Sequence, residues 1–424
     1  MTSSSSSSST AGVVPRGPVL VVALAFFVDM LAYSLVVPFL PLQLMTSRAS
    51  STATGILFGS YAVALLVGSW TMAAVSRRFP VRTVIIAGLL GLVVSTTAYL
   101  LASSYAALLI ARTLQGLAAS ATWTAGPGLL AALTSTGPAR AVRGRVLAVA
   151  HTGSALGTLL GPPLGGALHL RGASLPFIVL VALVVIAVVA AIAWLPRSPP
   201  TSSSSASSST TTTTALLRHP AILGTGLVIA VGGAVLALLE PVLPPYLATR
   251  FHLDSGAIGL VFGAALISYA VVTMPIGALA DRFGARRVGA VGLVGCALVL
   301  PLITMAEQVV AVVVVFAALG VVVCGALGPA MAAMASAVDI ASGVDAVGNR
   351  VVDDHARVYA LYNTAYAIGM VAGPVLGSAL VDGVGHARAL QLVAGMCVGA
   401  AALASVSHRR RRTTTAITAS ASAS

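Results

Sequence analysis

Twelve long apolar runs constrain what this chain can fold into more than any other feature of its sequence. A helix needs about 20 apolar residues to cross the hydrocarbon core of a bilayer. Only 8% of the residues are charged and 58% are hydrophobic, whereas soluble proteins carry about 25% charge. We therefore predict an all-α membrane protein with twelve transmembrane helices. The runs lie near 18–44, 53–75, 83–103, 105–134, 144–170, 173–195, 220–249, 255–280, 287–306, 308–337, 355–381 and 386–407.

Tracts rich in Ser and Thr divide the chain into domains. Residues 201–214 read TSSSSASSSTTTTT and separate six apolar runs from six. Such tracts cannot bury apolar surface, so we expect them to be disordered. The predicted domains are a tail (1–17), a six-helix bundle (18–195), a cytoplasmic linker (196–219), a second six-helix bundle (220–407) and a second tail (408–424).

The two halves repeat each other in sequence. GILFG at 55–59 recurs as GLVFG at 259–263, at an offset of 204. The pattern GxxxGPxxG starts at Gly157 and again at Gly369, at an offset of 212. Matches in the same order along both halves indicate an internal duplication. Duplicated bundles with a binding site between them are typical of secondary transporters.

The basic residues are distributed unevenly over the predicted loops. All 23 are arginines, and the net charge is +13. If the N-terminus is inside, eighteen arginines fall on the cytoplasmic side and four outside, with Arg112 within a span. This positive-inside bias predicts that both termini are cytoplasmic. We assign the cluster Arg409–Arg412 to topology or lipid headgroups. A polyanion is the less favoured alternative, and we expect no nucleic-acid partner.

Two carboxylates fall within apolar runs. Asp29 lies about eleven residues into its run, roughly 16 Å deep at 1.5 Å per residue, where a charge costs about 2.5–3.5 kcal/mol. Glu240 lies nearer the outer face, and we expect Pro241, Pro244 and Pro245 to break or kink the helix that follows it. We predict that both acids bind or move a solute or protons. The alternatives are a structural hydrogen bond for Asp29 and an interfacial position for Glu240.

Arg112 is a cation within the fourth span and needs an acceptor there. We expect that acceptor to come from the first span or the backbone, with Gln115 three residues on along the same face. A role in organising the helices and a direct role in ion coupling remain equally open.

Small residues and charges mark candidate gates. Gly157, Gly161 and Gly165 line one helix face, which predicts a tight helix interface. That interface could also serve as a gate, together with the adjacent Pro162 and the repeat at Gly373 and Pro374. In the loop GALADRFGARR, Asp281 is flanked by Arg282 and Arg286. These charges predict a latch on the cytoplasmic side.

The sequence offers no metal-ligand spacing, no nucleophile–base pair and no phosphate loop. We therefore expect neither a cofactor nor a metal, and no enzymatic activity. The expected partners are a small solute, protons and the lipid bilayer, and we expect a monomer.

These motifs together resemble the major facilitator superfamily, and most of all its vesicular amine transporters and drug:proton antiporters. The resemblance rests on GALADRFGARR, GTLLGPPLGG, VDMLAYSLVVPFLP at Val28–Pro41, LIARTLQGLAAS at Leu109–Ser120 and LEPVLPPYL at Leu239–Leu247. It implies that Asp29 and Glu240 recognise an amine and couple protons, and that Arg112 matches the family's span-four arginine. The family's span-two lysine is replaced by Tyr61, and its span-eleven aspartate by Asn363.

The predicted function is proton-coupled antiport of an organic cation, amine or drug-like solute by alternating access, in the plasma membrane or a vesicle or vacuole membrane. A uniporter for a neutral solute is one alternative. A non-transporting sensor on a transporter fold is another, and a membrane enzyme ranks last.

Overall fold

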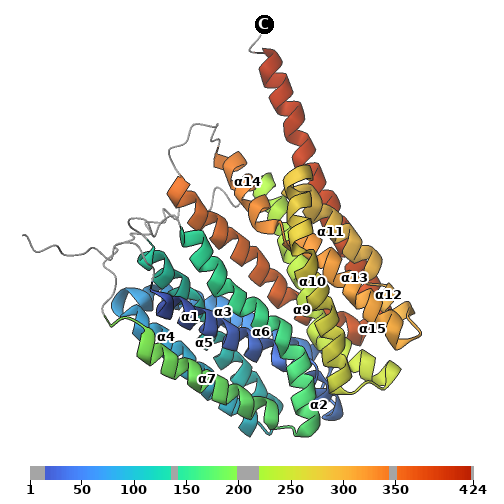
Figure 1. Cartoon of the computed structure of the whole chain (residues 1–424). Coiled ribbons are helices and arrows are strands. Elements are labelled where there is room, and N and C mark those ends of the chain that lie inside the picture. Colours follow the sequence, from blue (N-terminus) through green and yellow to red (C-terminus); the bar gives the residue numbers. More distant parts are fainter. Residues whose placement is uncertain (1–14, 135–141, 198–218, 343–350, 422–424) are drawn as a thin grey trace, which may run out of the picture. The chain divides into compact units, whose positions relative to one another are not determined.

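The computed structural model describes residues 15–134, 142–197, 219–342 and 351–421. Within these ranges the regular structure is helical and no strand occurs (Figure 1), which confirms the all-α prediction. Most of the predicted tail 1–17 and of the linker 196–219 lies outside the described residues.

The first half of the chain supplies seven of the described helices. They are α1 (Arg16–Leu35), α2 (Leu40–Thr46), α3 (Ser51–Arg78), α4 (Val81–Leu101), α5 (Tyr105–Leu133), α6 (Arg143–Arg171) and α7 (Leu175–Trp194). The second half supplies α9 (Pro220–Phe251), α10 (Ser255–Phe283), α11 (Ala285–Val299), α12 (Leu302–Met305), α13 (Val309–Leu327), α14 (Ala330–Ser342) and α15 (Val351–Ala421).

The helices account for all twelve predicted spans. Among the described residues, nine segments are long and apolar enough to cross a membrane. One of them, Ala360–Ser405, contains two spans, because Gly385 interrupts the helical backbone there with φ 78°. The 29-residue helices α5 and α6 occupy the two remaining predicted positions.

Prolines interrupt three predicted spans, whereas others lie inside continuous helices. The first span is interrupted between α1 and α2, around Pro38. Similar interruptions follow at Pro301 and at Pro329, because proline lacks the N–H that continues a helix. In the seventh span the expectation was a break or a kink, and no break occurs, since α9 continues through Pro241, Pro244 and Pro245; the kink stays a prediction. Neighbouring helices in a bundle can offset the hydrogen bonds that proline removes.

The described residues form two compact units that cut across the sequence halves. The first unit holds the described parts of Met1–Ser34, Ala64–Gly161 and Ser174–Ser205. The second holds those of Leu35–Val63, Pro162–Ala173 and Ala206–Ser424. The second unit therefore contains the whole described second half together with α2, the start of α3 and the end of α6.

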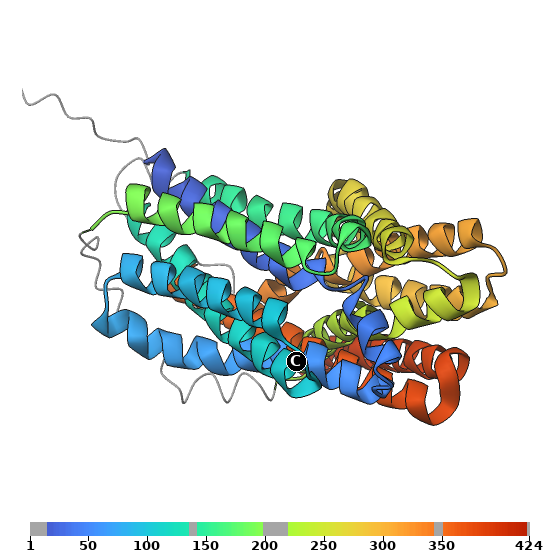
Figure 2. The ribbon, with the colours of Figure 1, turned by 90° about the horizontal axis from the view of Figure 1, so that it is seen from below.

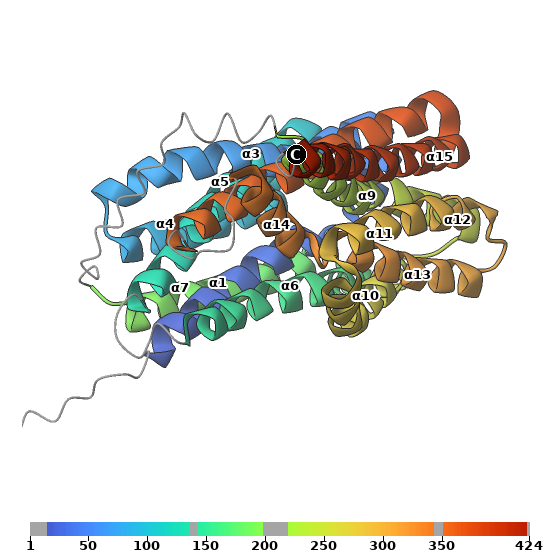
Figure 3. The same ribbon diagram turned by 90° about the horizontal axis from the view of Figure 1, so that it is seen from above.

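Each unit is packed through small residues. In the first, α4 lies against α5, where a Cβ on Gly88 would come within 2.9 Å of the Ala121 Cβ. In the second, α10, α11 and α13 lie side by side (Figure 3), and a Cβ on Gly292 would collide with the α13 backbone at Gly325 and Ala326. Such close helix approach is the usual basis of packing in lipid, where hydrophobic transfer gives little.

Candidate functional site

Asp29 is buried in the first unit and hydrogen-bonded to an aromatic side chain. Its exposed fraction is 1%, and its Oδ2 accepts a hydrogen bond from Trp123 Nε1 at 2.6 Å. The two residues lie on α1 and α5. A short bond from an indole N–H to a carboxylate is of the strong, charge-assisted kind. This contact is therefore compatible both with a structural role for Asp29 and with a role in binding a solute or a proton.

Aromatic rings extend this cluster onto a third helix. The Trp123 ring stacks on Phe26, with ring centroids 4.3 Å apart and an interplanar angle of 10°. The His151 ring on α6 lies 5.5 Å from Phe26 and 6.0 Å from Trp123. Trp123 and His151 are partly exposed. The aromatic site, as we call Asp29, Phe26, Trp123 and His151, therefore joins a buried carboxylate to accessible ring faces.

Arg112 is fully buried and contacts α1 at Tyr33, one helical turn along from Asp29. Its Nη1 donates to the Tyr33 carbonyl oxygen on α1 at 3.3 Å and to Gln115 Oε1 at 3.1 Å. The guanidinium carbon lies 4.6 Å from the centre of the Tyr33 ring. The acceptor expected from the first span or the backbone is the Tyr33 carbonyl oxygen, and Gln115, on the same helix face, is a second one. These bonds tie α1 to α5 beside Asp29 and so fix the helix that carries the carboxylate.

The repeated glycine motif lets α6 and α15 lie against the backbones of α1 and α9. A Cβ on Gly157 would lie 2.8 Å from Leu31 N. A Cβ on Gly369 would lie 2.8 Å from Ala234 N. The predicted tight interface is confirmed in both halves. The Ser34 hydroxyl also donates to the Gly157 carbonyl oxygen at 3.3 Å, so α6 holds α1 just beyond Asp29.

Within the second unit, helices of the two sequence halves cross at glycines. Gly55 on α3 faces Pro374 and Ser378 on α15, and the two helices lie together in Figure 2. Gly259 on α10 faces Pro162 on α6 in the same way. The repeated GILFG and GLVFG segments thus each meet a proline of the GxxxGPxxG motif from the other half. We call these contacts the glycine crossings.

A carboxylate adjoins the first glycine crossing. Asp382, near the end of the first part of α15, accepts hydrogen bonds from the backbone N–H of Ser51 at 3.0 Å and of Thr52 at 2.8 Å. The Thr52 hydroxyl donates to the same carboxylate at 2.7 Å. These N–H groups are among those that the start of α3 leaves without an intrahelical partner. Asp382 therefore caps a helix of the other sequence half, a contact that the sequence analysis missed.

Comparison with known proteins places this architecture in a family. The model of the Major Facilitator Superfamily matches the chain twice, over residues 22–240 and 225–423. The chain belongs to the major facilitator superfamily. Members of this superfamily are transporters rather than enzymes, as the sequence predicted. The first match covers the first half and extends to residue 240 in α9, and the second covers the second half.

Individual members of the superfamily are similar to this chain in sequence. The human synaptic vesicular amine transporter is 30% identical over 80% of this chain and 63% of its own length. The rat chromaffin granule amine transporter is 29% identical over 78% of this chain and 61% of its own length. The chain thus spans less than two thirds of these relatives. The human MFS-type transporter SLC18B1 is 26% identical over 96% of this chain and 91% of its own length.

Solved structures share the superfamily fold at low identity. A bacterial homologue of the human lysosomal transporter Spinster superposes with a TM-score of 0.75 at 15% identity, covering 92% of this chain and 96% of its own. The nucleoside transporter NupG gives a TM-score of 0.73 at 13% identity, covering 92% of this chain and 98% of its own. Both support the predicted twelve-helix fold.

A second carboxylate and three tyrosines gather in the second unit of this superfamily member. Glu240 on α9 is partly exposed. Tyr366 on α15 lies within electrostatic range of Glu240, Tyr362 and Tyr269, and its ring is nearly parallel to that of Tyr362, with centroids 6.1 Å apart. We call this group the tyrosine site. Like the aromatic site, it combines one carboxylate with several ring faces.

The remaining predicted residues are dispersed. Tyr61 is buried in the part of α3 that belongs to the second unit, at 2% exposure, and Asn363 on α15 is exposed. Asp281 and Arg282 are exposed, and the Arg282 guanidinium carbon lies 5.3 Å from the centre of the Phe283 ring. In the part of the chain that the structure describes, no ion pair joins Asp281 to the neighbouring arginines, so the charge latch remains a prediction.

Proposed function

We propose that the protein is a proton-coupled antiporter that exports an organic cation, in the broad class of amines and drug-like compounds. The observation that carries this proposal is the aromatic site, where a buried carboxylate is bonded to Trp123 beside stacked rings. A cation is attracted both by the carboxylate and by the negative faces of aromatic rings. An anion or a neutral solute would not need this combination.

The coupling follows from competition for the same oxygens. A carboxylate that binds a proton loses its negative charge, and its attraction for a cationic solute falls with it. Within a bilayer, such a group is expected to mark an ion or proton pathway. We propose that Asp29 in the first unit and Glu240 in the second both take part, each beside its own set of rings. Because Asn363 cannot release a proton, coupling rests on these two acids.

The glycine crossings provide the moving contacts. We propose that they close the extracytoplasmic side when the site is open to the cytoplasm, the side on which the positive-inside bias predicts both termini. Separation of α3 from α15 and of α10 from α6 would then open the site outward. Rocking of one repeat against the other is the usual route to alternating access in duplicated transporters.

The names of the relatives support an amine as the solute and a vesicle membrane as one location. They do so at 30% identity or less. The residues that carry the argument in this chain are Asp29, Trp123 and Glu240. Substitution of Tyr61 and Asn363 for charged family residues supports a cation preference broader than that of the named relatives.

The test is uptake of labelled amines into proteoliposomes under an imposed pH gradient. Asp29→Asn is expected to abolish gradient-driven uptake, whereas Glu307→Gln, at an exposed acid outside the site, should leave it unchanged. Retention of full gradient-driven uptake by Asp29→Asn would contradict the proposal. Uptake that is unaffected by the gradient in the unmodified protein would indicate a uniporter instead.

A further inference from the structure

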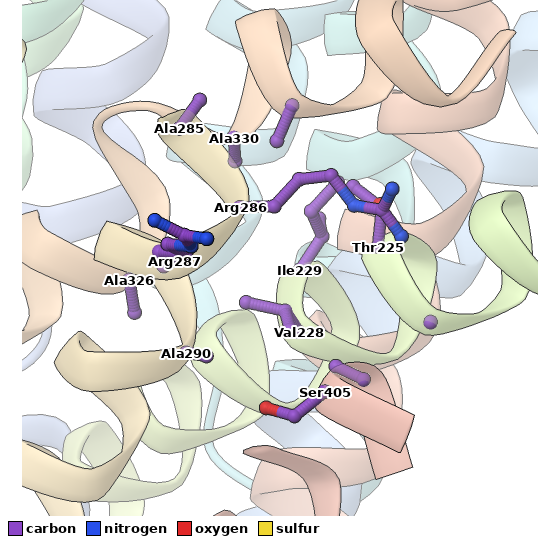
Figure 4. A pocket seen from close by; sticks show the side chains of 14 residues that line it. Thr225, Val228, Ile229, Ala285, Arg286, Arg287, Ala290, Ala326, Ala330 and Ser405 are labelled. Carbon is purple, nitrogen blue, oxygen red and sulfur yellow. The ribbon is translucent and has the colours of Figure 1, made fainter. Parts of the chain in front are cut away.

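A cavity in the second unit lies apart from the two carboxylate sites. Its volume is about 340 Å³, and it opens between the start of α11 and residues of α9, α13, α14 and α15 (Figure 4). Most of its lining is small and apolar, contributed by alanines, glycines, Val228 and Ile229. Two side chains differ from this wall, Arg286 and Arg287.

The two arginines bring positive charge to the cavity, and its described lining residues include no acid. Figure 4 shows the Arg286 side chain reaching from α11 toward Thr225 on α9, while Arg287 lies on the side of Ala326. Arg286 is partly buried and Arg287 is exposed. In the described ranges neither guanidinium has a hydrogen bond or ion pair. A partly buried guanidinium that lacks an anionic partner favours binding of an external anion.

The other polar groups of the lining do not oppose an anion. The Thr225 hydroxyl donates to the Ala221 carbonyl oxygen at 2.9 Å, and the Ser405 hydroxyl donates to the Ala401 carbonyl oxygen at 2.8 Å. No carboxylate is among the lining residues. Gly284, at the start of α11, supplies no side-chain cap, so the positive end of the helix dipole adds to the arginine charge.

We infer that this cavity binds a phosphate group, with Arg286 and Arg287 as its ligands. Arginine is suited to phosphate because its planar N–H groups can bond two oxygens at once. The apolar wall formed by Val228, Ile229 and Ala330 would accommodate an attached hydrocarbon chain. Two kinds of ligand could supply the phosphate group, a phospholipid through its headgroup or a soluble phosphate. The inference does not depend on the proposed solute or on proton coupling.

The first experiment measures binding to the purified full-length protein in detergent. Native mass spectrometry counts bound molecules of phosphatidic acid or phosphatidylcholine, and thermal unfolding is followed with each lipid or with inorganic phosphate. Phosphatidic acid, whose phosphate carries no choline, is expected to bind and to raise the melting temperature. Equal binding of phosphatidylcholine, or no binding of either lipid or of phosphate, would overturn the inference.

Variants decide whether the arginines are responsible. The double variant Arg286→Gln, Arg287→Gln should weaken binding at least about tenfold, since one charge-assisted hydrogen bond is already worth about that factor. The matched control is Arg143→Gln, Arg145→Gln, which also removes two arginines from the start of a helix, in exposed positions of α6. Equal loss of binding in both double variants would refute the assignment.

A third variant distinguishes a phospholipid from a soluble phosphate as the ligand. It also keeps both arginines, so a response that it retains shows that the protein is still folded. Ala330→Leu narrows the cavity at a buried position of α14 but keeps both arginines. If a phospholipid is the ligand, this variant should lose lipid binding and keep the effect of inorganic phosphate. If soluble phosphate is the ligand, both the variant and the unmodified protein should respond to phosphate, and lipid should add nothing. If the unmodified protein binds lipid and the variant binds it equally well, a site in this cavity is contradicted.

Discussion

A methyl group added at Gly55 should force the first glycine crossing apart. A Cβ at this position would lie 2.7 Å from Ser378 Oγ and 2.8 Å from Ser378 Cβ, and closer still to the Pro374 carbonyl oxygen. Carbon atoms pack best at about 3.5–4.0 Å, so α3 and α15 would have to separate by roughly 1 Å. Overpacking of this kind costs about 1–3 kcal/mol. An equilibrium between closed and open crossings would shift by about 5- to 150-fold.

The assay is the accessibility of a buried neighbour of Gly55. Thr54 is 5% exposed, and a Thr54→Cys background allows labelling with a membrane-impermeant maleimide. The native cysteines Cys296, Cys324 and Cys397 are buried and should contribute a low background. Gly55→Ala should raise the labelling rate by about 5- to 150-fold, because the rate follows the open fraction when the crossing opens and closes quickly.

A matched glycine separates overpacking from any effect of alanine on the helix itself. At Gly128 on α5, no heavy atom lies within 4 Å of the position of an added Cβ. Gly128→Ala should therefore leave the labelling rate unchanged and make the helix slightly more stable. If Gly55→Ala and Gly128→Ala give the same labelling rate, the crossing does not limit access and the reasoning fails.

Two further variants test individual contacts. Trp123→Phe keeps a ring but removes the hydrogen bond to Asp29, so the KM for a transported amine should rise about 10-fold or more, since a bond to a charged group is worth about 1.5–3 kcal/mol. Trp70→Phe, at a 72% exposed position, is its control, and an equal rise in KM for both would contradict a role for the bond. Asp382→Ala should increase labelling at Thr54 by about 2- to 5-fold, because an exposed cap is worth about 0.5–1 kcal/mol, and an unchanged rate would show that the cap does not hold the crossing.

Span positions could be predicted well because they depend on local composition. The fourth run was placed at 105–134, and α5 covers Tyr105–Leu133. The fifth was placed at 144–170, and α6 covers Arg143–Arg171. Apolar length is set by the bilayer and not by the neighbouring helices. The glycine motif was equally informative, since a face of small residues has few uses other than close packing.

The effect of each proline could not be predicted, because it depends on the surroundings. Pro38 and Pro329 lie where helices end, whereas the three prolines of α9 lie within a continuous helix. The residue type is the same in both cases. What differs is the surroundings of each segment, and α9 packs extensively against α15.

The composition of the aromatic site also depends on contacts that sequence spacing does not reveal. Trp123 lies within the predicted fourth span, but its bond to Asp29 joins residues 94 positions apart. His151 has no neighbour at ligand spacing in the sequence, so the sequence gives no direct signal for it. It reaches the site because α6 packs closely on α1, so the glycine motif was the indirect signal for its position.

The duplicated helices α3 and α10 differ in how their starts are capped. From this difference we expect the Asp382 cap to break when α3 separates from α15. At the repeat offset of 204, Ser50 corresponds to Asp254. Asp254 caps α10 from its own chain segment, accepting from Ala257 N at 2.8 Å. Ser50 caps α3 more weakly, at 3.1 Å from Ala53 N, and the carboxylate comes from Asp382 on α15.

A cap within one segment survives any movement of the helix, whereas a cap from another helix exists only while the two stay together. Asp254→Ala should therefore lower thermal stability and leave labelling at Thr54 unchanged. Asp382→Ala should change labelling and have a smaller effect on the melting temperature. The opposite pattern would mean that the cap from α15 is a fixed part of the fold and that the first glycine crossing does not open during transport.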